Sequence, residues 1–244
     1  MTGECTFQVF RGDISGGELK QYKVPVETGM VVLDAIHWIQ ANGAPDLACR
    51  WNCKAAKCGS CSAEVNGRPK LMCKTRLDEY SQGTTMVVRP MRTFPVVRDL
   101  VTDVKSNYAM ARKITPFTPK AGAEWKWYQE DIDRVQEFRK CIQCFLCQDV
   151  CHVLRDHDQH ESFAGPAFFV QTAALEMHPM DDADRLPLLK ESLGVGLCNI
   201  TKCCTEVCPE DIHITDNAII PLKERVVDRF YDPLRILWRR ITGK

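Results

Sequence analysis

The chain has 244 residues, 45% of them hydrophobic and 26% charged, with 32 basic and 32 acidic side chains. This composition is ordinary for a globular protein, which excludes collagen-like and wholly disordered chains, and the zero net charge disfavours a nucleic-acid-binding protein, which is normally basic. No apolar run approaches the ~20 residues of a membrane span, and the N-terminus lacks the pattern of a secretory signal, so we expect a soluble, cytoplasmic chain that can still sit against a membrane through partners.

The first half of the chain has the pattern of a small sheet with one helix. Alternating and β-branched residues predict short strands, and apolar residues at helical spacing before Gly43 predict a helix. The expected strands are 6–10, 22–26, 62–65 and 84–88, with the helix over 31–42. We therefore predict a β-grasp domain over residues 1–106.

After a proline-containing stretch at 115–122, the pattern becomes helical. Helical spacing marks residues 132–138, 168–175 and 219–230. These residues predict an all-α domain over 107–244. The fold class we expect is α+β, with an N-terminal β-grasp ferredoxin domain followed by a helical domain of the bacterial-ferredoxin type.

Cysteine is the compositional outlier, with 14 residues. In a reducing compartment such a density indicates metal ligation rather than disulfides. The first group has the spacing C-x4-C-x2-C-x11-C, the plant-type ferredoxin arrangement for a [2Fe–2S] cluster, and consists of Cys53, Cys58, Cys61 and Cys73. A structural zinc site is the alternative, but zinc favours paired C-x2-4-C knuckles. Cys49 lies outside the pattern, and we interpret it as a small apolar residue.

The second group has the spacing C-x2-C-x2-C-x3-C of two-cluster ferredoxins and consists of Cys141, Cys144, Cys147 and Cys151. The third group repeats this register with Thr201 in place of one cysteine, leaving Cys198, Cys204 and Cys208. Because the fourth cysteine of each run ligates the other cluster, we predict two ligand sets. A [4Fe–4S] cluster takes Cys141, Cys144, Cys147 and Cys208, and a [3Fe–4S] cluster takes Cys151, Cys198 and Cys204. Cys203, beside the gap, is the rival fourth ligand.

Three clusters in one chain indicate a path for electrons. The sequence has no G-x-G-x-x-G fingerprint and no P-loop, so it offers no recognisable flavin or nicotinamide site of its own. Such a chain has no substrate site and must take electrons from one partner and pass them to another.

The order of these three cysteine groups resembles the iron–sulfur subunit of succinate dehydrogenase and fumarate reductase. The stretches FPVVRDLVTD (94–103) and AGPAFF (164–169) resemble segments of that family, and the nearest likeness is to actinobacterial, menaquinone-linked forms. The resemblance implies a flavoprotein partner holding FAD, a membrane anchor with quinone, and a peripheral position at the cytoplasmic face of the cell membrane. Electrons would pass from FAD through [2Fe–2S], [4Fe–4S] and [3Fe–4S] to quinone.

Three alternatives stay open at this point. The same subunit in a fumarate reductase would run the electrons in reverse. An iron–sulfur subunit of another flavoenzyme commonly lacks the β-grasp half that is present here. A non-redox interaction module stabilised by structural zinc would be colourless and would contain zinc and no iron.

Two regions carry further expectations. The tail 221–244 has seven basic and three acidic residues, and we expect Arg235, Trp238, Arg239 and Arg240 to lie near the anchor subunit and anionic headgroups. The family's quinone pocket uses a proline and tryptophans after the second cysteine run and a histidine in the third.

This sequence departs from that quinone pocket. The corresponding positions hold His152, Arg155 with Asp156, and Asn199. Quinone ligation therefore does not carry over by residue, and His152 is the candidate proton donor beside the terminal cluster.

Overall fold

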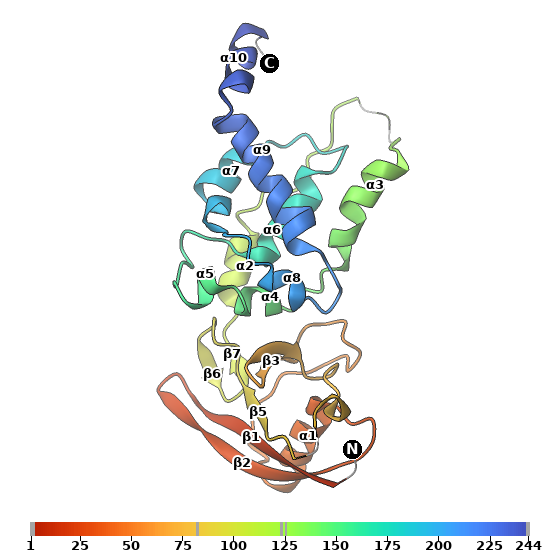
Figure 1. Ribbon diagram of the computed structural model, residues 1–244, viewed down its shortest axis with the longest axis vertical. Coiled ribbons are helices and arrows are strands. Elements are labelled where there is room, and N and C mark those ends of the chain that lie inside the picture. The colour runs from red at the N-terminus through yellow and green to blue at the C-terminus, as the bar shows by residue number, and fades with distance from the viewer. Residues whose placement is uncertain (1–2, 82, 123, 125, 243–244) are drawn as a thin grey trace. The chain divides into compact units, whose positions relative to one another are not determined.

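The computed structural model describes residues 3–81, 83–122, 124 and 126–242. Two compact units are formed. The first comprises residues 1–106 together with two short segments from later in the chain, 142–150 and 207–209; the second comprises 107–141, 151–206 and 210–244. The first unit holds the sheets and the second holds most of the helices (Figure 1). The predicted α+β class is confirmed.

A five-stranded sheet with the order β2-β1-β5-β3-β4 forms the first unit. Its strands are β1 (Gly3–Asp13), β2 (Gly16–Val26), β3 (Ser62–Val65), β4 (Arg68–Leu71) and β5 (Met86–Arg89). β1 pairs antiparallel with β2 and parallel with β5. The helix α1 (Val32–Asn42) buries Val32, Ile36 and Ile39, as the spacing predicts. Its last turn ends where the Gly43 N–H donates to the Ile39 carbonyl.

Strand β4 is absent from the sequence prediction because of its composition. It reads RPKL, with Pro69 inside it, and proline cannot donate to a sheet ladder. The strand lies at the edge of the sheet, where one side of its backbone needs no partner strand. The edge position therefore accommodates Pro69, which in the sequence is unfavourable for a strand.

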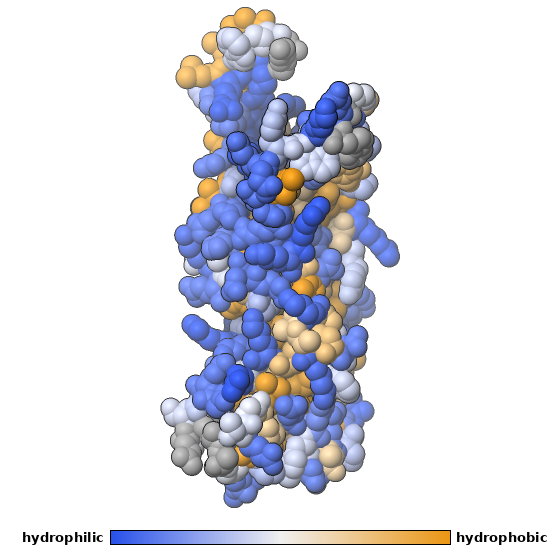
Figure 2. Space-filling model, turned by 90° about the vertical axis from the view of Figure 1, so that its right-hand side faces the viewer, coloured by the Kyte–Doolittle hydropathy of each residue, from blue (hydrophilic) through white to orange (hydrophobic). Residues whose placement is uncertain are grey.

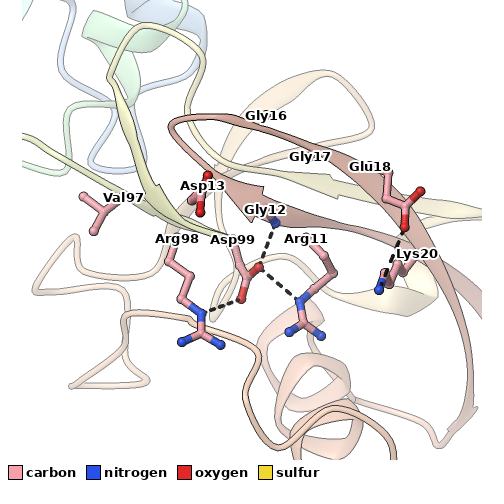
Figure 3. Close-up of a pocket in the computed structure, with 10 residues that line it drawn as sticks. All are labelled: Arg11, Gly12, Asp13, Gly16, Gly17, Glu18, Lys20, Val97, Arg98 and Asp99. Carbon is pink, nitrogen blue, oxygen red and sulfur yellow. Dashed lines mark hydrogen bonds and ion pairs between the residues drawn. The ribbon is translucent and has the colours of Figure 1, made fainter.

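A buried carboxylate fastens the hairpin of β6 (Val96–Arg98) and β7 (Val101–Thr102) to the main sheet. Asp99 is 2% exposed and lies in the left-handed region with φ of +49°. It accepts hydrogen bonds from the Arg11 Nε at 3.1 Å, the Gly12 N–H at 3.0 Å and the Ala48 N–H at 2.8 Å. Figure 3 shows Asp99 between Arg11 and Arg98, to which it is also ion-paired.

The remaining helices are short, with a few longer ones between the cysteine runs and after the last. They are α2 (Lys105–Ala111), α3 (Gln129–Gln136), α4 (Leu146–Asp149), α5 (His152–Arg155), α6 (Pro166–Glu176), α7 (Leu186–Glu191), α8 (Cys203–Glu206), α9 (Ile220–Phe230) and α10 (Pro233–Thr242), with a π-helical turn η4 (Ile214–Ile219) and the 3₁₀ turns η1 (Leu77–Glu79), η2 (Glu137–Lys140) and η3 (Val195–Leu197). In the described part, no helix has the length and hydropathy to cross a membrane.

The core of the second unit is built around α6, which packs against η4. Phe168, Phe169, Leu189 and Leu222 are almost fully buried. A buried ion pair belongs to this interior: the Arg185 guanidinium lies 2.8 Å from the Asp181 carboxylate, and both side chains are buried.

The Arg185 guanidinium also donates to the carbonyls of Thr115 and Pro116, at 2.8 and 2.7 Å. The proline-containing stretch that the sequence marks as a connection is thus held by a buried ion pair.

Candidate iron–sulfur centres

The first cysteine loop lies between α1 and β3 and turns its backbone amides toward a sulfur. The N–H groups of Ala55 and Lys57 both donate to the Cys53 Sγ at 3.3 Å. Such amide donors stabilise the negative charge of a thiolate and of a cluster bound to it. This loop therefore has the chemistry that an anionic iron–sulfur centre needs.

The four cysteines predicted to hold [2Fe–2S] come together in the first unit. Cys58 interacts with the Ser60 hydroxyl and the Cys53 side chain, and these hydrogen bonds lower the pKa of the Cys58 thiol to about 6. The Cys61 side chain interacts with that of Cys73. Burial raises the pKa of the Cys61 thiol to about 12, and the charge of Cys58 adds to this rise. Bound iron would replace the proton on each sulfur.

A conformational feature is shared by all three cysteine loops. Residues other than glycine rarely adopt positive φ, yet pairs of them do so within each cysteine run. A left-handed residue next to a right-handed one turns successive N–H groups toward a common centre and forms a concavity that binds anions. The residues are Lys54 and Ala56 in the first loop, Gln143 and Phe145 in the second, and Ile200 and Lys202 in the third.

The second loop packs against the first within the first unit. Cys144 and Cys147 are buried, and α4 begins at Leu146. The Ser62 hydroxyl interacts with the Cys144 carbonyl at 2.9 Å and the Gly59 carbonyl at 2.8 Å.

The segment 207–209, with Cys208, belongs to the same unit. There the Lys74 Nζ donates to the Pro209 carbonyl at 2.8 Å. Three of the four cysteines predicted for [4Fe–4S] thus share this unit, whereas Cys141 ends a segment of the second unit.

The third group gathers in the second unit. Cys151 and Cys204 are buried, and burial raises the pKa of their thiols to about 11 and about 12. The charges of Cys198 and Cys203 add to the rise of both pKa values, so these two thiols lie near Cys151 and Cys204. The structure therefore brings together the three predicted [3Fe–4S] ligands, and it places the rival Cys203 in the same cluster of thiols.

Thr201, which replaces a cysteine in the repeated spacing, lies beside Cys203. Its Oγ1 is 3.3 Å from the Cys203 Sγ. Two further residues support this group and were not identified from the sequence. The Thr215 Oγ1 lies 3.4 Å from the Cys204 Sγ. The Lys223 Nζ donates to the Cys198 carbonyl at 2.6 Å. Neither residue belongs to a recognisable motif.

The candidate His152 follows Cys151 directly and begins α5. Its Nε2 is buried and has no hydrogen-bond partner among the described residues. Its ring lies near that of His157, with 6.3 Å between centroids. The position fits a group held beside the third cysteine cluster.

A polar pocket of about 790 Å³ in the first unit has no cysteine in its lining (Figure 3). Its cations are engaged within the protein: Arg11 and Arg98 both pair with Asp99 and with Asp46, and Lys20 lies 3.9 Å from Glu18. We interpret this pocket as a structural junction between hairpins.

The fourteen cysteines all lie in the described part, and none forms a disulfide. Among the described residues, no three or more histidine, cysteine or carboxylate side chains form a group suited to a single metal ion.

Comparison with known proteins matches both halves of the chain to cluster-binding families. Residues 6–109 match a 2Fe-2S iron-sulfur cluster binding domain, and residues 137–212 match a 4Fe-4S dicluster domain. The chain is 32% identical over 206 residues to the fumarate reductase iron-sulfur subunit of Mycobacterium tuberculosis, covering 81% of this chain and 82% of that protein.

Two further relatives extend this comparison. An uncharacterised iron-sulfur protein of Methanococcus maripaludis is 30% identical over 223 residues, or 87% of this chain, which spans only 42% of that longer protein. A chain of the Mycobacterium smegmatis Sdh1 complex in the apo form is 58% identical, with a TM-score of 0.93, covering 96% of this chain and 100% of that one.

These matches confirm the predicted [2Fe–2S] and [4Fe–4S] cofactors and the role of an electron-transfer subunit in an oxidoreductase complex, and they agree with the predicted [3Fe–4S] cluster. The chain belongs to the family of iron–sulfur subunits of succinate dehydrogenases and fumarate reductases.

Proposed function

We propose that this subunit carries electrons from the FAD of a flavoprotein partner to a quinone, (mena)quinone by its family likeness, at a membrane anchor of a succinate:quinone oxidoreductase. The order of transfer is [2Fe–2S], [4Fe–4S], then [3Fe–4S]. The observation that carries the proposal is the packing of the second cysteine loop on the first, because electron transfer between centres requires short separations. The chain's own contribution is to hold the centres and shield them.

We propose the crossed ligand sets set out above. The division of the chain supports them: Cys208 belongs to the first unit with Cys144 and Cys147, whereas Cys151 belongs to the second unit with Cys198 and Cys204. Each of the two crossing cysteines thus groups with the run opposite its own. The assignment of Cys141 rests on its spacing. The proposed division into domains 1–106 and 107–244 rests on the change from a strand pattern to a helical pattern along the sequence.

Clusters bound at these cysteines would supply one-electron redox chemistry. The protein's part is electrostatic and structural. The amides of Ala55 and Lys57 point at Cys53, and the Lys223 ammonium lies on the carbonyl of Cys198. Donors and positive charge favour the more negative, reduced state of a centre and therefore raise its reduction potential.

The proposed partners are a flavoprotein that holds FAD and one or more membrane anchor subunits that hold quinone. We place the subunit peripherally at the cytoplasmic face of the membrane. The Mycobacterium smegmatis structure named above is that of an Sdh1 complex, which supports association with partner subunits. We keep His152 as the candidate quinone-side residue because of its buried, unpartnered Nε2.

The test is a stopped-flow and freeze-quench EPR experiment on the complex purified through a tag on this chain. Succinate should reduce the [2Fe–2S] and [3Fe–4S] centres, so that the [2Fe–2S] signal appears and the [3Fe–4S] signal is lost. An added menaquinone analogue should reverse both changes. His152→Ala should slow quinone reduction while leaving succinate oxidation by an artificial acceptor unchanged. His160→Ala, at a half-buried histidine near Asp158, is the matched control. Absence of a co-purifying flavoprotein, or clusters that succinate leaves oxidised, would contradict the proposal.

The physiological direction is a separate question, since the relatives bear both names. Film voltammetry of the complex, with succinate and fumarate compared at equal concentration, measures the bias directly. A larger oxidative current supports a dehydrogenase, and a larger reductive current supports the fumarate reductase alternative.

A further inference from the structure

Helix α10 ends the described chain and buries none of its ten residues. Leu234, Leu237, Trp238 and Ile241 are between 55% and 77% exposed. Their spacing of three, four and seven residues places them on one face of the helix. Figure 2 shows hydrophobic surface on this end of the second unit, where Figure 1 labels α10. A contiguous exposed apolar face of this kind marks an interaction surface.

The charges on α10 have one sign. Residues 233–244 include Arg235, Arg239, Arg240 and Lys244 and no acidic residue. Arg235 pairs with Asp228 of α9 at 2.8 Å, and the Arg239 guanidinium donates to the Asp228 carbonyl. The surface that accompanies the apolar face is therefore cationic, and it is complementary to anions.

A guanidinium-lined pocket of about 470 Å³ adjoins the apolar face. Its lining includes Arg225, Arg229, Arg235 and Arg239, with Asp228 as its single carboxylate and Trp238 at its side. Guanidinium groups bind phosphate oxygens through paired N–H donors. The pocket therefore offers phosphate-binding chemistry next to a tryptophan and exposed aliphatic side chains.

We propose that α10 lies in the interface of a bilayer that contains anionic phospholipids, with its four apolar side chains inserted between headgroups and its arginines on phosphates. A helix of ten residues is about 15 Å long, half of the ~30 Å hydrocarbon core, so its geometry suits the interface rather than a span. Basic charge, a tryptophan and a one-sided apolar face are the features of interfacial helices. This inference does not depend on the route of the electrons.

A lipid surface fits these observations better than a protein groove. The apolar side chains lie on a single helix that, among the described elements, contacts chiefly α9. A bilayer adapts to such a shape, whereas a protein partner would have to supply an acidic groove. Docking on a protein is the competing outcome of the test.

The test measures binding of the full cluster-loaded chain to vesicles by co-sedimentation. One set contains equal parts phosphatidylglycerol and phosphatidylcholine, and the other contains phosphatidylcholine alone. We expect binding to the anionic vesicles that weakens at high salt. Leu237→Glu should reduce the partition coefficient at least tenfold, whereas Ile14→Glu, at a site 83% exposed in the first unit, should not change it.

A second pair of variants separates charge from insertion. Arg235→Gln with Arg240→Gln should lower binding and flatten its salt dependence, and Trp238→Phe should remove a blue shift of tryptophan emission seen on anionic vesicles. EPR of the clusters verifies that every variant is folded. No binding to anionic vesicles, equal binding by Leu237→Glu, or binding only to membranes that retain an intact protein partner would each overturn the proposal.

Discussion

The main chain of Cys144 runs against Gly59, so that a Cβ placed on Gly59 would lie 2.6 Å from the Cys144 Cα. Both residues belong to the first unit, although 85 positions of sequence separate them. Gly59 sits in the loop predicted to hold [2Fe–2S], and Cys144 in the loop predicted to hold [4Fe–4S]. Only glycine satisfies both the close approach and the φ of +68°.

Gly59→Ala should therefore damage two centres at once. The added methyl group must displace the backbone of Cys144, and positive φ adds strain of about 1–3 kcal/mol. We expect lower iron content and weaker [2Fe–2S] and [4Fe–4S] signals in EPR. Gly67→Ala is the matched control, because Gly67 has φ of +76° but no neighbour within 4 Å of the added Cβ. Equal iron content in both variants would refute the packing argument.

Crossed ligation predicts which signal each cysteine supports. Cys208→Ser should weaken the [4Fe–4S] signal first, and Cys151→Ser should weaken the [3Fe–4S] signal first. Quantitative EPR of the purified complex at several reduction levels checks both. The reverse pattern would show that each run ligates its own cluster.

Thr201 tests why the third cluster is expected to hold three irons instead of four. If only the lack of a thiolate excludes a fourth iron, Thr201→Cys should convert the centre to [4Fe–4S] and lower its reduction potential, because an added anionic ligand favours the oxidised state. Redox titration followed by EPR measures this change.

Cys203→Ser removes the competing thiol 3.3 Å from the Thr201 hydroxyl and should leave the [3Fe–4S] signal of the otherwise natural chain intact. Loss of that signal would instead make Cys203 a ligand. An unchanged [3Fe–4S] signal in Thr201→Cys would mean that local sterics exclude the iron.

Glu176 gives a pH-dependent prediction in the second unit. Burial raises its carboxyl pKa above the ordinary 4.5, opposed by Arg225 at 3.8 Å and by Arg185, while Asp184 adds to the rise. The folded chain therefore holds this proton to higher pH than the unfolded chain, so the stabilisation is complete below pH 4.5 and is lost as pH rises through the folded pKa.

Glu176→Gln should raise the unfolding midpoint at pH 7–8, with the gain shrinking toward pH 5. Thermal unfolding of the loaded chain, followed by circular dichroism across this range, measures the difference from the natural chain. The exposed Glu191→Gln should show no such trend. A gain that grows as pH falls would reverse the sign and exclude the burial argument.

The cysteine spacings predicted the types of cluster that the family matches support, because cluster ligation imposes fixed intervals along the chain. The individual ligand sets stay predictions. The helix ending at Gly43 followed equally from its apolar period. Strand β4 was not predicted because it contains Pro69, which a strand tolerates only at the edge of a sheet. Whether a strand lies at the edge is decided by the assembled sheet and cannot be read from the sequence. The hydrogen bonds to Asp99, the approach of Cys144 to Gly59, and Thr215 beside Cys204 all join residues whose pairing only the tertiary fold decides.

The chain is proposed to hold three iron–sulfur clusters that accept electrons from succinate. EPR of the purified complex, oxidised and then reduced by succinate, tests this when it is combined with iron, zinc and sulfide analysis. We expect iron and acid-labile sulfide without stoichiometric zinc, a [3Fe–4S] signal in the oxidised state, and [2Fe–2S] and [4Fe–4S] signals on stepwise reduction. A colourless protein that contains zinc and no sulfide, or one whose clusters exchange no electrons with succinate, would contradict it.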